Sequence, residues 1–326
     1  MNVQYFCTLF DSNYLLKGVA MLRSLKENCP EAHIHVLCMD ERTQKILHML
    51  DMSFVTCIPL VAIESHALLA AKQTRSVAEY CWTLSPSLPW YVLQNNSRIN
   101  FITYVDADLL FYSPVQPLFD EIGNASVAII EHRFATQFRQ LEVNGRFCVE
   151  WVSFRRDAQG MACLSRWREQ CIEWCYSRSE DGRFGDQKYL DEWPQQYEKL
   201  HILQHIGAGV APWNYAQYDF CMNEQGKITI NGALLIFYHF HTFQLLDNGK
   251  FDRLSPAYAG ISPEPGDVYS MYEKILAALL IEIRLMVPDF SGGLKSASKL
   301  SRQRWFSRWV LMWIPDAIKN KLRQLI

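Results

Sequence analysis

At residues 101–112 the chain reads Phe-Ile-Thr-Tyr-Val-Asp-Ala-Asp-Leu-Leu-Phe-Tyr. An apolar strand of this kind ends at Asp106, and at a spacing of two residues Asp106 and Asp108 can point to one side of an extended backbone. Two carboxylates beside a small residue suit Mg²⁺ or Mn²⁺, which complete their shells with water and substrate phosphates. The run therefore predicts a site for a metal and a diphosphate. The simpler alternative is a strand end with two solvated aspartates.

The residues before this run alternate between strand-like and helical patterns. Strands are expected at 3–9, 33–38 and 54–58, and helices at 14–26, 42–50, 75–82 and 89–95. This alternation is typical of βαβ units. It predicts an α/β fold with a Rossmann-like, mainly parallel central sheet flanked by helices, whose ligands gather beyond the carboxyl ends of the strands.

The pattern is mixed after residue 125. Strands are expected at 126–130 and 149–154, a long helix at 157–176 and a short helix at 186–192. Asn231-Gly232 between apolar runs predicts a hairpin that brings in His239 and His241. Beyond residue 250 strand character is lost, and an amphipathic helix at 268–286, a linker at 291–301 and a last helix follow.

Composition excludes several classes of protein. The 326 residues are 49% hydrophobic and 20% charged, which is typical of a globular protein with a large core. A formal net charge of -2 disfavours nucleic acid as a partner. The ten cysteines form no CxxC pair, so we expect structural thiols in a reducing compartment. We expect no signal peptide and no transmembrane helix, and hence a cytoplasmic protein.

Five short elements occur in a definite order over about residues 1–243. They are Thr8-Leu-Phe-Asp11-Ser-Asn-Tyr14 with Ser24-Leu25, Tyr104-Val-Asp106-Ala-Asp108 with Leu118-Phe119, Gly185-Asp186-Gln187, Pro212-Trp213-Asn214, and His239-Phe240. In these elements the chain resembles glycosyltransferase family 8 and its GT-A relatives, such as glycogenin and bacterial lipopolysaccharide galactosyltransferases. The resemblance implies a GT-A fold and a metal-assisted transfer of sugar from a nucleotide diphosphate.

The resemblance also implies a ligand set. Asp106 and Asp108, with Ala107 between them, would hold Mn²⁺ or Mg²⁺ against the donor diphosphate, and His239 would be a third ligand. An imidazole suits Mn²⁺ better than Mg²⁺. His241 lies on the same side of an extended strand, so it is an alternative ligand or a contact to phosphate or acceptor.

Further roles follow from the resemblance. Thr8, Leu9, Asp11 and Tyr14 would form the pocket for the base and ribose, although Tyr14 suits core packing at a helix start equally well. Asp186 and Gln187 would lie beside the transferred sugar and take part in catalysis, and Asp186 also suits a helix cap. Trp213, Asn214 and His241 would contact substrate, although Trp213 suits plain packing equally well.

Two segments depart from the family pattern. Relatives carry an Arg or Lys in a Y-x-R segment, where this chain has Tyr80-Cys-Trp-Thr, so Lys72 and Arg75 are the expected substitutes for binding phosphate. Relatives show Asn-x-Gly facing the donor sugar, where residues 147–154 read Phe-Cys-Val-Glu-Trp-Val-Ser-Phe. The sugar and the stereochemistry therefore stay open, and the family implies retention of the anomeric configuration.

The last 32 residues, 295–326, mix basic side chains with three tryptophans and one phenylalanine. This mixture is typical of an interfacial helix on anionic lipid, and a helix docked on the domain is the alternative. We therefore expect a transferase domain at 1–250, a loop and packing helix at 251–294, and a tail at 295–326 that can place the protein at the inner face of the membrane.

The interpretation favoured by the sequence is a metal-dependent hexosyltransferase using a UDP-sugar and a glycan or glycolipid acceptor, such as a lipopolysaccharide or capsule intermediate. Two alternatives remain. A phosphatase or phosphotransferase would use Asp106 as nucleophile and Asp108 as acid. A catalytically inactive, membrane-peripheral carbohydrate-binding protein is favoured by the departure at Cys148 to Glu150.

Overall fold

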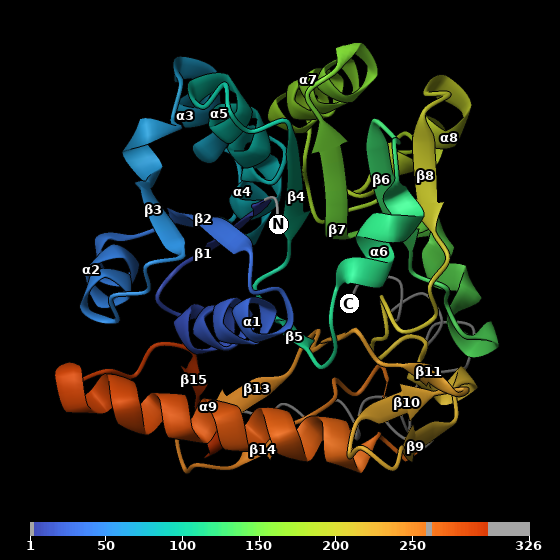
Figure 1. The fold of residues 1–326 in the computed structure, drawn as a ribbon. Coiled ribbons are helices and arrows are strands. Elements are labelled where there is room, and N and C mark those ends of the chain that lie inside the picture. The colour runs from blue at the N-terminus through green and yellow to red at the C-terminus, as the bar shows by residue number, and fades with distance from the viewer. Residues whose placement is uncertain (1–2, 259–262, 299–326) are drawn as a thin grey trace, which may run out of the picture.

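A seven-stranded sheet forms the centre of the computed structural model, which describes residues 3–258 and 263–298 (Figure 1). The strand order is β3-β2-β1-β4-β7-β6-β8. The strands are β1 (Gln4–Phe10), β2 (Ala32–Cys38), β3 (Val55–Pro59), β4 (Phe101–Val105), β6 (Val127–Glu131), β7 (Phe147–Arg155) and β8 (Leu200–Leu203). β3, β2, β1 and β4 are mutually parallel, β7 is antiparallel to both its neighbours, and β6 and β8 are parallel. The mainly parallel sheet predicted from the sequence is confirmed.

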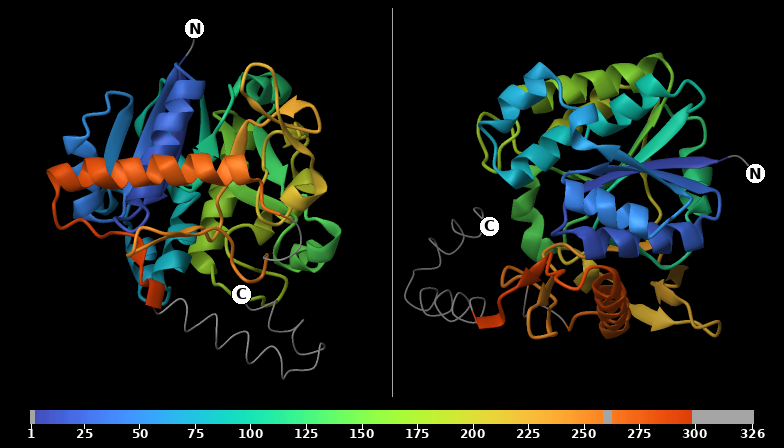
Figure 2. Two further views of the ribbon diagram at one scale, coloured as in Figure 1. Left: turned by 90° about the horizontal axis from the view of Figure 1, so that it is seen from below. Right: turned by 90° about the vertical axis from the view of Figure 1, so that its left-hand side faces the viewer.

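Helices cover both faces of this sheet, as the right-hand view of Figure 2 shows. One face carries α3 (His66–Lys72), α4 (Val77–Leu84), α5 (Ser87–Asn95) and α7 (Ala158–Glu173), and α1 (Leu15–Asn28) and α2 (Glu41–Met49) lie on the other. Successive strand residues point to opposite faces. The fully buried neighbours Phe6 and Cys7 accordingly belong to two different hydrophobic clusters.

Shorter elements connect the strands and helices. They are η1 (Leu60–Ala62), α6 (Gln116–Ile122), η2 (Thr136–Asn144), η3 (Lys188–Glu192), α8 (Trp193–Gln196) and η4 (Tyr215–Gln217). The ten cysteines all lie within the described residues and are free thiols, most of them buried.

The hairpin predicted at Asn231-Gly232 is confirmed, with both residues at positive φ between β10 (Ile228–Ile230) and β11 (Ala233–Leu234). β9 (Phe220–Met222) pairs with β10 on the other side. The histidines are not on this hairpin, contrary to the prediction. His239 instead ends the next strand, β12 (Phe237–His239), which pairs antiparallel with β5 (Leu109–Phe111).

Strand structure continues beyond residue 250, where the sequence indicated none. β13 (Gln244–Leu246), β14 (Phe251–Asp252) and β15 (Leu294–Lys295) form a three-stranded sheet. β15 is parallel to β13, so the linker expected at 291–301 begins with a paired strand. Such short strands have no readable periodicity of their own.

α9 (Gly266–Met286) crosses α1 and confirms the predicted amphipathic helix (Figures 1 and 2). Both terminal nitrogens of Arg23 on α1 donate to the Glu282 carboxylate, at 2.7 and 2.6 Å. Among the described helices, none has the length and hydropathy to cross a membrane. The basic and aromatic tail falls almost entirely on residues 299–326, which lie outside the described residues.

Candidate active site

Backbone pairing brings the predicted ligands together. Asp106 follows the end of β4, and its amide donates to the carbonyl of Glu150 on β7 at 3.2 Å. Asp108 immediately precedes β5, whose Leu109 lies opposite His239 on β12. The amide of Phe240 donates to the carbonyl of Asp108 at 2.9 Å. Two strand pairings therefore place Asp106, Glu150 and His239 around one point.

The side chains of Asp106, Asp108 and His239 offer three ligand atoms that all lie within 4.8 Å of one another. Nε2 of His239 is 3.0 Å from Oδ1 of Asp108 and 4.0 Å from Oδ2 of Asp106. Asp108 and His239 are buried, and Asp106 is partly exposed. Two carboxylates and one imidazole fit a divalent cation such as Mn²⁺. His241 is not part of this group.

Burial and the neighbouring charges shift the pKa values of all three residues. Burial, followed by the charges of Asp108 and Glu150, raises the pKa of Asp106 to about 7 against the opposing effect of His239. Burial alone would lower the pKa of His239, but Asp108, Cys148 and Glu150 outweigh it and hold that pKa well above the usual range. The same imidazole and Lys17 keep the pKa of Asp108 below its ordinary value despite burial. A bound cation would relieve the repulsion between the carboxylates.

Lys17 on α1 adds a cation that the sequence analysis did not identify. Its Nζ lies 3.7 Å from Oδ2 of Asp108 and 4.7 Å from the centre of the Tyr14 ring. Burial, and then the charge of Lys295, lower its pKa. Both lysines line a cavity of about 290 Å³ with Asn13, Tyr14 and His241.

Tyr14 and Lys17 are three residues apart, which places them on one face of a helix, so the sequence could have indicated that Lys17 lies beside Tyr14. Lys295 gave none, because only the pairing of β15 with β13 brings it to the cavity. Gly292 and Gly293, just before Lys295, also lie close to the loop after β1. Ideal Cβ atoms on these glycines would lie 2.1 Å from the carbonyl of Ser12 and 2.2 Å from that of Asn13.

The predicted nucleotide-pocket residues lie at the end of β1 and in the following turn. Thr8 is fully buried, and its hydroxyl has no hydrogen-bond partner among the described residues. Leu9 is 7% exposed. Oδ1 of Asp11 accepts from the amides of Asn13 and Tyr14, which shapes the turn. Tyr14 is 45% exposed, and the charge of Asp108, then burial, raises its pKa. Its ring is therefore not a core residue.

Asp186 is a further buried acidic residue. It is 5% exposed, and burial together with the charge of Asp106 raises its pKa to about 7. Its backbone carbonyl accepts from the indole of Trp167 at 2.8 Å. Gln187 turns away, because its amide donates to the carbonyl of Asn144 at 2.9 Å. Asp186 therefore interacts with Asp106 through its charge, and the Gln187 side chain is held by Asn144.

Trp213 and Asn214 build the wall behind His239. Trp213 is 4% exposed, its ring centre lies 5.2 Å from that of His239, and its indole donates to the carbonyl of His132. The Asn214 amide donates to the carbonyls of His132 and Gly209. His241 packs beside Trp213 and lines the 290 Å³ cavity, and burial, then the charge of His239, lowers its pKa to about 4.

Lys72 and Arg75 form contacts in other places. Lys72 pairs with Glu64 at 2.6 Å. Arg75 lies over the Tyr176 ring, with its Cζ 3.7 Å from the ring centre, and donates to backbone carbonyls at the end of α7. Neither has a contact with Asp106 or Asp108 among the interactions of the described residues.

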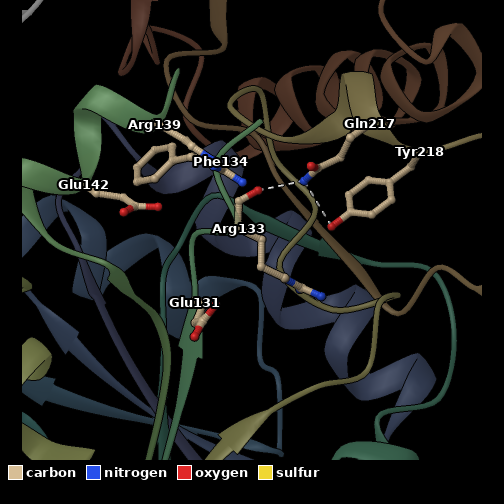
Figure 3. Close-up of a pocket in the computed structure, with 7 residues that line it drawn as sticks. All are labelled: Glu131, Arg133, Phe134, Arg139, Glu142, Gln217 and Tyr218. Carbon is tan, nitrogen blue, oxygen red and sulfur yellow. Dashed lines mark hydrogen bonds between the residues drawn. The ribbon is translucent and has the colours of Figure 1, made fainter. Parts of the chain in front are cut away.

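A second cavity, of about 480 Å³, opens beyond the carboxyl end of β6 (Figure 3). Its lining residues are Glu131, Arg133, Phe134, Arg139, Glu142, Gln217 and Tyr218. The Gln217 amide donates to the backbone carbonyl of Arg133 at 2.7 Å, as the dashed line in Figure 3 shows. Phe134 stacks on His132, and its ring centre is 6.2 Å from that of Trp213. The rings of Phe134 and Trp213 therefore connect the wall of this cavity with His239.

Sequence comparison identifies relatives over nearly the whole chain. The uncharacterized protein YfnF of Bacillus subtilis (strain 168) is 30% identical over 294 residues, which cover 88% of this chain and 96% of YfnF. The chain belongs to the family of YfnF and YfnD. The uncharacterized protein YfnD, from the same organism, is 31% identical over 298 residues, covering 90% of this chain and 95% of YfnD. No protein-family model matches the sequence.

Solved structures give this member of the YfnF and YfnD family its fold. The galactosyltransferase LgtC, in a complex with donor and acceptor sugar analogs, superposes with a TM-score of 0.50 and 14% identity over 85% of this chain and 96% of LgtC. The glycosyltransferase GlyE of Streptococcus pneumoniae TIGR4 superposes with a TM-score of 0.50 and 13% identity over 86% of this chain and 64% of GlyE. The fold is the GT-A fold, as the sequence resemblance implied.

Proposed function

We propose that the chain is a metal-dependent glycosyltransferase that moves a hexose from a UDP-sugar to a glycan or glycolipid acceptor. The observation that carries this proposal is the group of Asp106, Asp108 and His239 at the carboxyl end of β4 in a GT-A fold. Ligands of parallel sheets bind at such strand ends. The LgtC structure, of the same fold, holds donor and acceptor sugar analogs.

Asp106, Asp108 and Nε2 of His239 would hold the cation. A bound Mn²⁺ supplies a Lewis acid for the charge that develops on a departing diphosphate. Lys17 and Lys295 contribute two further positive charges on the cavity next to Asp108, where phosphate oxygens would bind. These lysines take the role that we expected of Lys72 and Arg75. Thr8, Leu9, Asp11 and Tyr14 lie along the strand and turn that would hold the nucleoside.

Asp186 is the candidate for direct action on the sugar. Its buried carboxylate lies within the electrostatic reach of Asp106, so it would face the sugar next to the diphosphate. There it would accept a hydrogen bond from a sugar hydroxyl and stabilise positive charge at the anomeric carbon. Retention of the anomeric configuration belongs to the proposal, and NMR of the product formed at early times would test it.

The 480 Å³ cavity at Arg133 is the candidate acceptor site. It combines the aromatic faces of Phe134 and Tyr218 with polar groups of Arg139 and Gln217, which suits a sugar ring and its hydroxyls (Figure 3). The ring centre of Phe134, on the wall of this cavity, is 6.2 Å from that of Trp213, and the ring centre of Trp213 is 5.2 Å from that of His239, so the cavity is a neighbour of the proposed metal site. A lipid-linked glycan would fit the basic, aromatic tail.

A thermal-shift panel of UDP- and GDP-sugars, with and without Mn²⁺, tests the donor class. We expect one UDP-sugar to raise the melting temperature, and to do so only with Mn²⁺, because the cation and the diphosphate bind together. Equal shifts with and without Mn²⁺ would contradict the proposed site. Release of phosphate from simple esters would instead favour the phosphatase alternative, and metal-independent binding of glycan the inactive one.

A further inference from the structure

Glu150 lies on β7 beside His239 and is completely buried. Its Oε2 lies 2.7 Å from Nδ1 of His239. Its Oε1 has no hydrogen-bond partner among the described residues. A buried carboxylate is costly unless it is paired, so the contact with His239 has to offset this cost.

The imidazole of His239 lies between two acidic groups. Nδ1 faces Glu150, and Nε2 faces Asp108 at 3.0 Å. A cation binds an imidazole in its neutral form, which carries one proton, so a hydrogen bond donated by Nδ1 leaves a lone pair on Nε2 for the cation. That lone pair then points at the space shared with Asp106 and Asp108.

We propose that Glu150 is a positioning residue that fixes the ring orientation and tautomer of His239 so that Nε2 binds the divalent cation. This inference rests on the metal site of the proposed function. It also gives a role to the segment that departs from the family pattern: a carboxylate at this position supports the histidine ligand from behind. Hydrogen bonds of this kind orient histidine ligands in many metal sites.

The neighbouring loop is shaped around this carboxylate. Gly209 has a φ of +69°, and a Cβ there would lie 2.9 Å from Oε1 of Glu150. The carbonyl of Gly209 accepts from the Asn214 amide at 2.7 Å, and the carbonyl of Val210 accepts from the amide of His239 at 2.8 Å. Glycine at 209 therefore leaves room for Glu150, and the same loop holds the backbone of His239.

Cys148 provides the competing interpretation, because it forms a second potential ligand group with Glu150 and His239. An ion bound there would use Nδ1 and a thiolate, and it would be a soft metal such as Zn²⁺. Glu150 would then be a ligand and not a positioning residue. The two arrangements use opposite nitrogens of one ring.

The test measures Mn²⁺ binding to the full-length protein by electron paramagnetic resonance, together with the pulsed-resonance signal of ¹⁴N bound to Mn²⁺. Glu150→Leu removes the hydrogen bond, and Glu150→Gln keeps an acceptor for Nδ1. Glu169→Gln is the matched control, since Glu169 is exposed on α7 and its carboxylate accepts a hydrogen bond from the Ser165 hydroxyl.

We expect Glu150→Leu to weaken Mn²⁺ binding by about 10- to 100-fold and to reduce the ¹⁴N signal. Glu150→Gln should keep the signal with a smaller loss of affinity, and Glu169→Gln should match the wild type. A wild-type affinity and ¹⁴N signal in Glu150→Leu would overturn the proposal. So would Zn²⁺ binding that outcompetes Mn²⁺ and is lost in Cys148→Ala.

A measurement on the unaltered protein covers the case in which Glu150→Leu does not fold. With ¹⁵N-labelled histidine and Mg²⁺, NMR should place the proton of His239 on Nδ1, and a proton on Nε2 overturns the proposal. Neither measurement depends on turnover. Mn²⁺ binding with no change in melting temperature on adding nucleotide sugars would contradict the proposed function, but it would not contradict the role of Glu150.

Discussion

Nε2 of His239 lies 3.0 Å from Oδ1 of Asp108, and the next residue, Phe240, donates its amide to the carbonyl of Asp108. The pairing of β5 with β12 brings the two residues together, although the two strands are far apart in the sequence. The fold therefore places the backbones of Asp108 and His239 next to each other. This geometry leads to the predictions below.

Replacing Lys17 by Met should separate nucleotide binding from metal binding. The Nζ charge lies beside Asp108 and on the wall of the 290 Å³ cavity. We expect the Kd for UDP in the presence of Mn²⁺ to rise by about 10-fold or more, because a charge-assisted contact to phosphate is lost. Mn²⁺ affinity should not fall, since a competing cation is removed. Isothermal titration measures both affinities, and Lys45→Met, at an exposed lysine, is the control. An unchanged affinity for UDP would exclude a contact between Lys17 and the phosphates.

Stabilisation by Mn²⁺ should increase with pH. Folding raises the pKa of Asp106 and Asp186 to about 7, so between about pH 4 and 7 the folded, metal-free protein holds more protons than the unfolded chain. Its stability therefore falls as the pH rises, and the raised pKa of His239 acts in the same direction. Mn²⁺ displaces these protons, so its affinity should rise by up to about tenfold per pH unit for each proton released.

Melting temperatures with and without Mn²⁺ at pH 6, 7 and 8 measure this linkage. The shift caused by Mn²⁺ should be largest at pH 8 and smaller in Asp106→Asn at every pH. A shift that is independent of pH would show that the cation does not compete with protons at these residues.

Gly292→Ala should destabilise the protein and weaken nucleotide binding. The added methyl group would lie 2.1 Å from the carbonyl of Ser12, in the turn that precedes Tyr14. Relief of such an overlap costs about 1–3 kcal/mol. The control is Gly266→Ala at the start of α9, where no atom lies within 4 Å of the added Cβ, so the change should be within about 0.5 kcal/mol. Urea unfolding compares the two, and equal stabilities would contradict the packing described here.

Removal of residues 299–326 should reduce binding to anionic vesicles. The cut belongs after Ser298, because Leu294 and Lys295 pair with β13 and Lys295 lines the cavity. Flotation with phosphatidylglycerol vesicles should recover the full-length chain and not the shortened one, and the shortened chain should keep its affinity for UDP. Equal flotation of both chains would contradict the prediction that the tail binds the membrane surface.

Much of the fold could be predicted from the sequence because the evidence is local. The apolar strand before Asp106 was predicted from its composition, and the hairpin at Asn231-Gly232 has a turn signature that depends on two residues. The set of Asp106, Asp108 and His239 was implied by the family resemblance, which combines short motifs from distant parts of the chain. By contrast, β15 and the position of Lys295 depend on pairing with a distant strand, which no short pattern encodes.

The parts of the site that were missed depend on three-dimensional contacts. In the sequence, Glu150 was noted only as a departure from the family pattern. Its contact with His239 arises because β7 lies beside β4 in the fold and β12 ends close to Asp106. Trp213 is buried behind His239, so the packing alternative describes its observed position. For Glu150 and for Trp213, the contact with His239 could not be predicted from the sequence because it joins segments that are distant in the chain.

The central claim is that Asp108 serves a metal-dependent sugar transfer, and the most direct measurement is the release of UDP from the donor selected by the thermal-shift panel. The assay compares the wild type, Asp108→Asn and the surface control Asp120→Asn, whose carboxylate contacts only Gln116 among the described hydrogen bonds. We expect Mn²⁺-dependent release by the wild type and the control, abolished by EDTA and reduced at least about 100-fold in Asp108→Asn. Release by Asp108→Asn at the wild-type rate, or release that persists in EDTA, would contradict it.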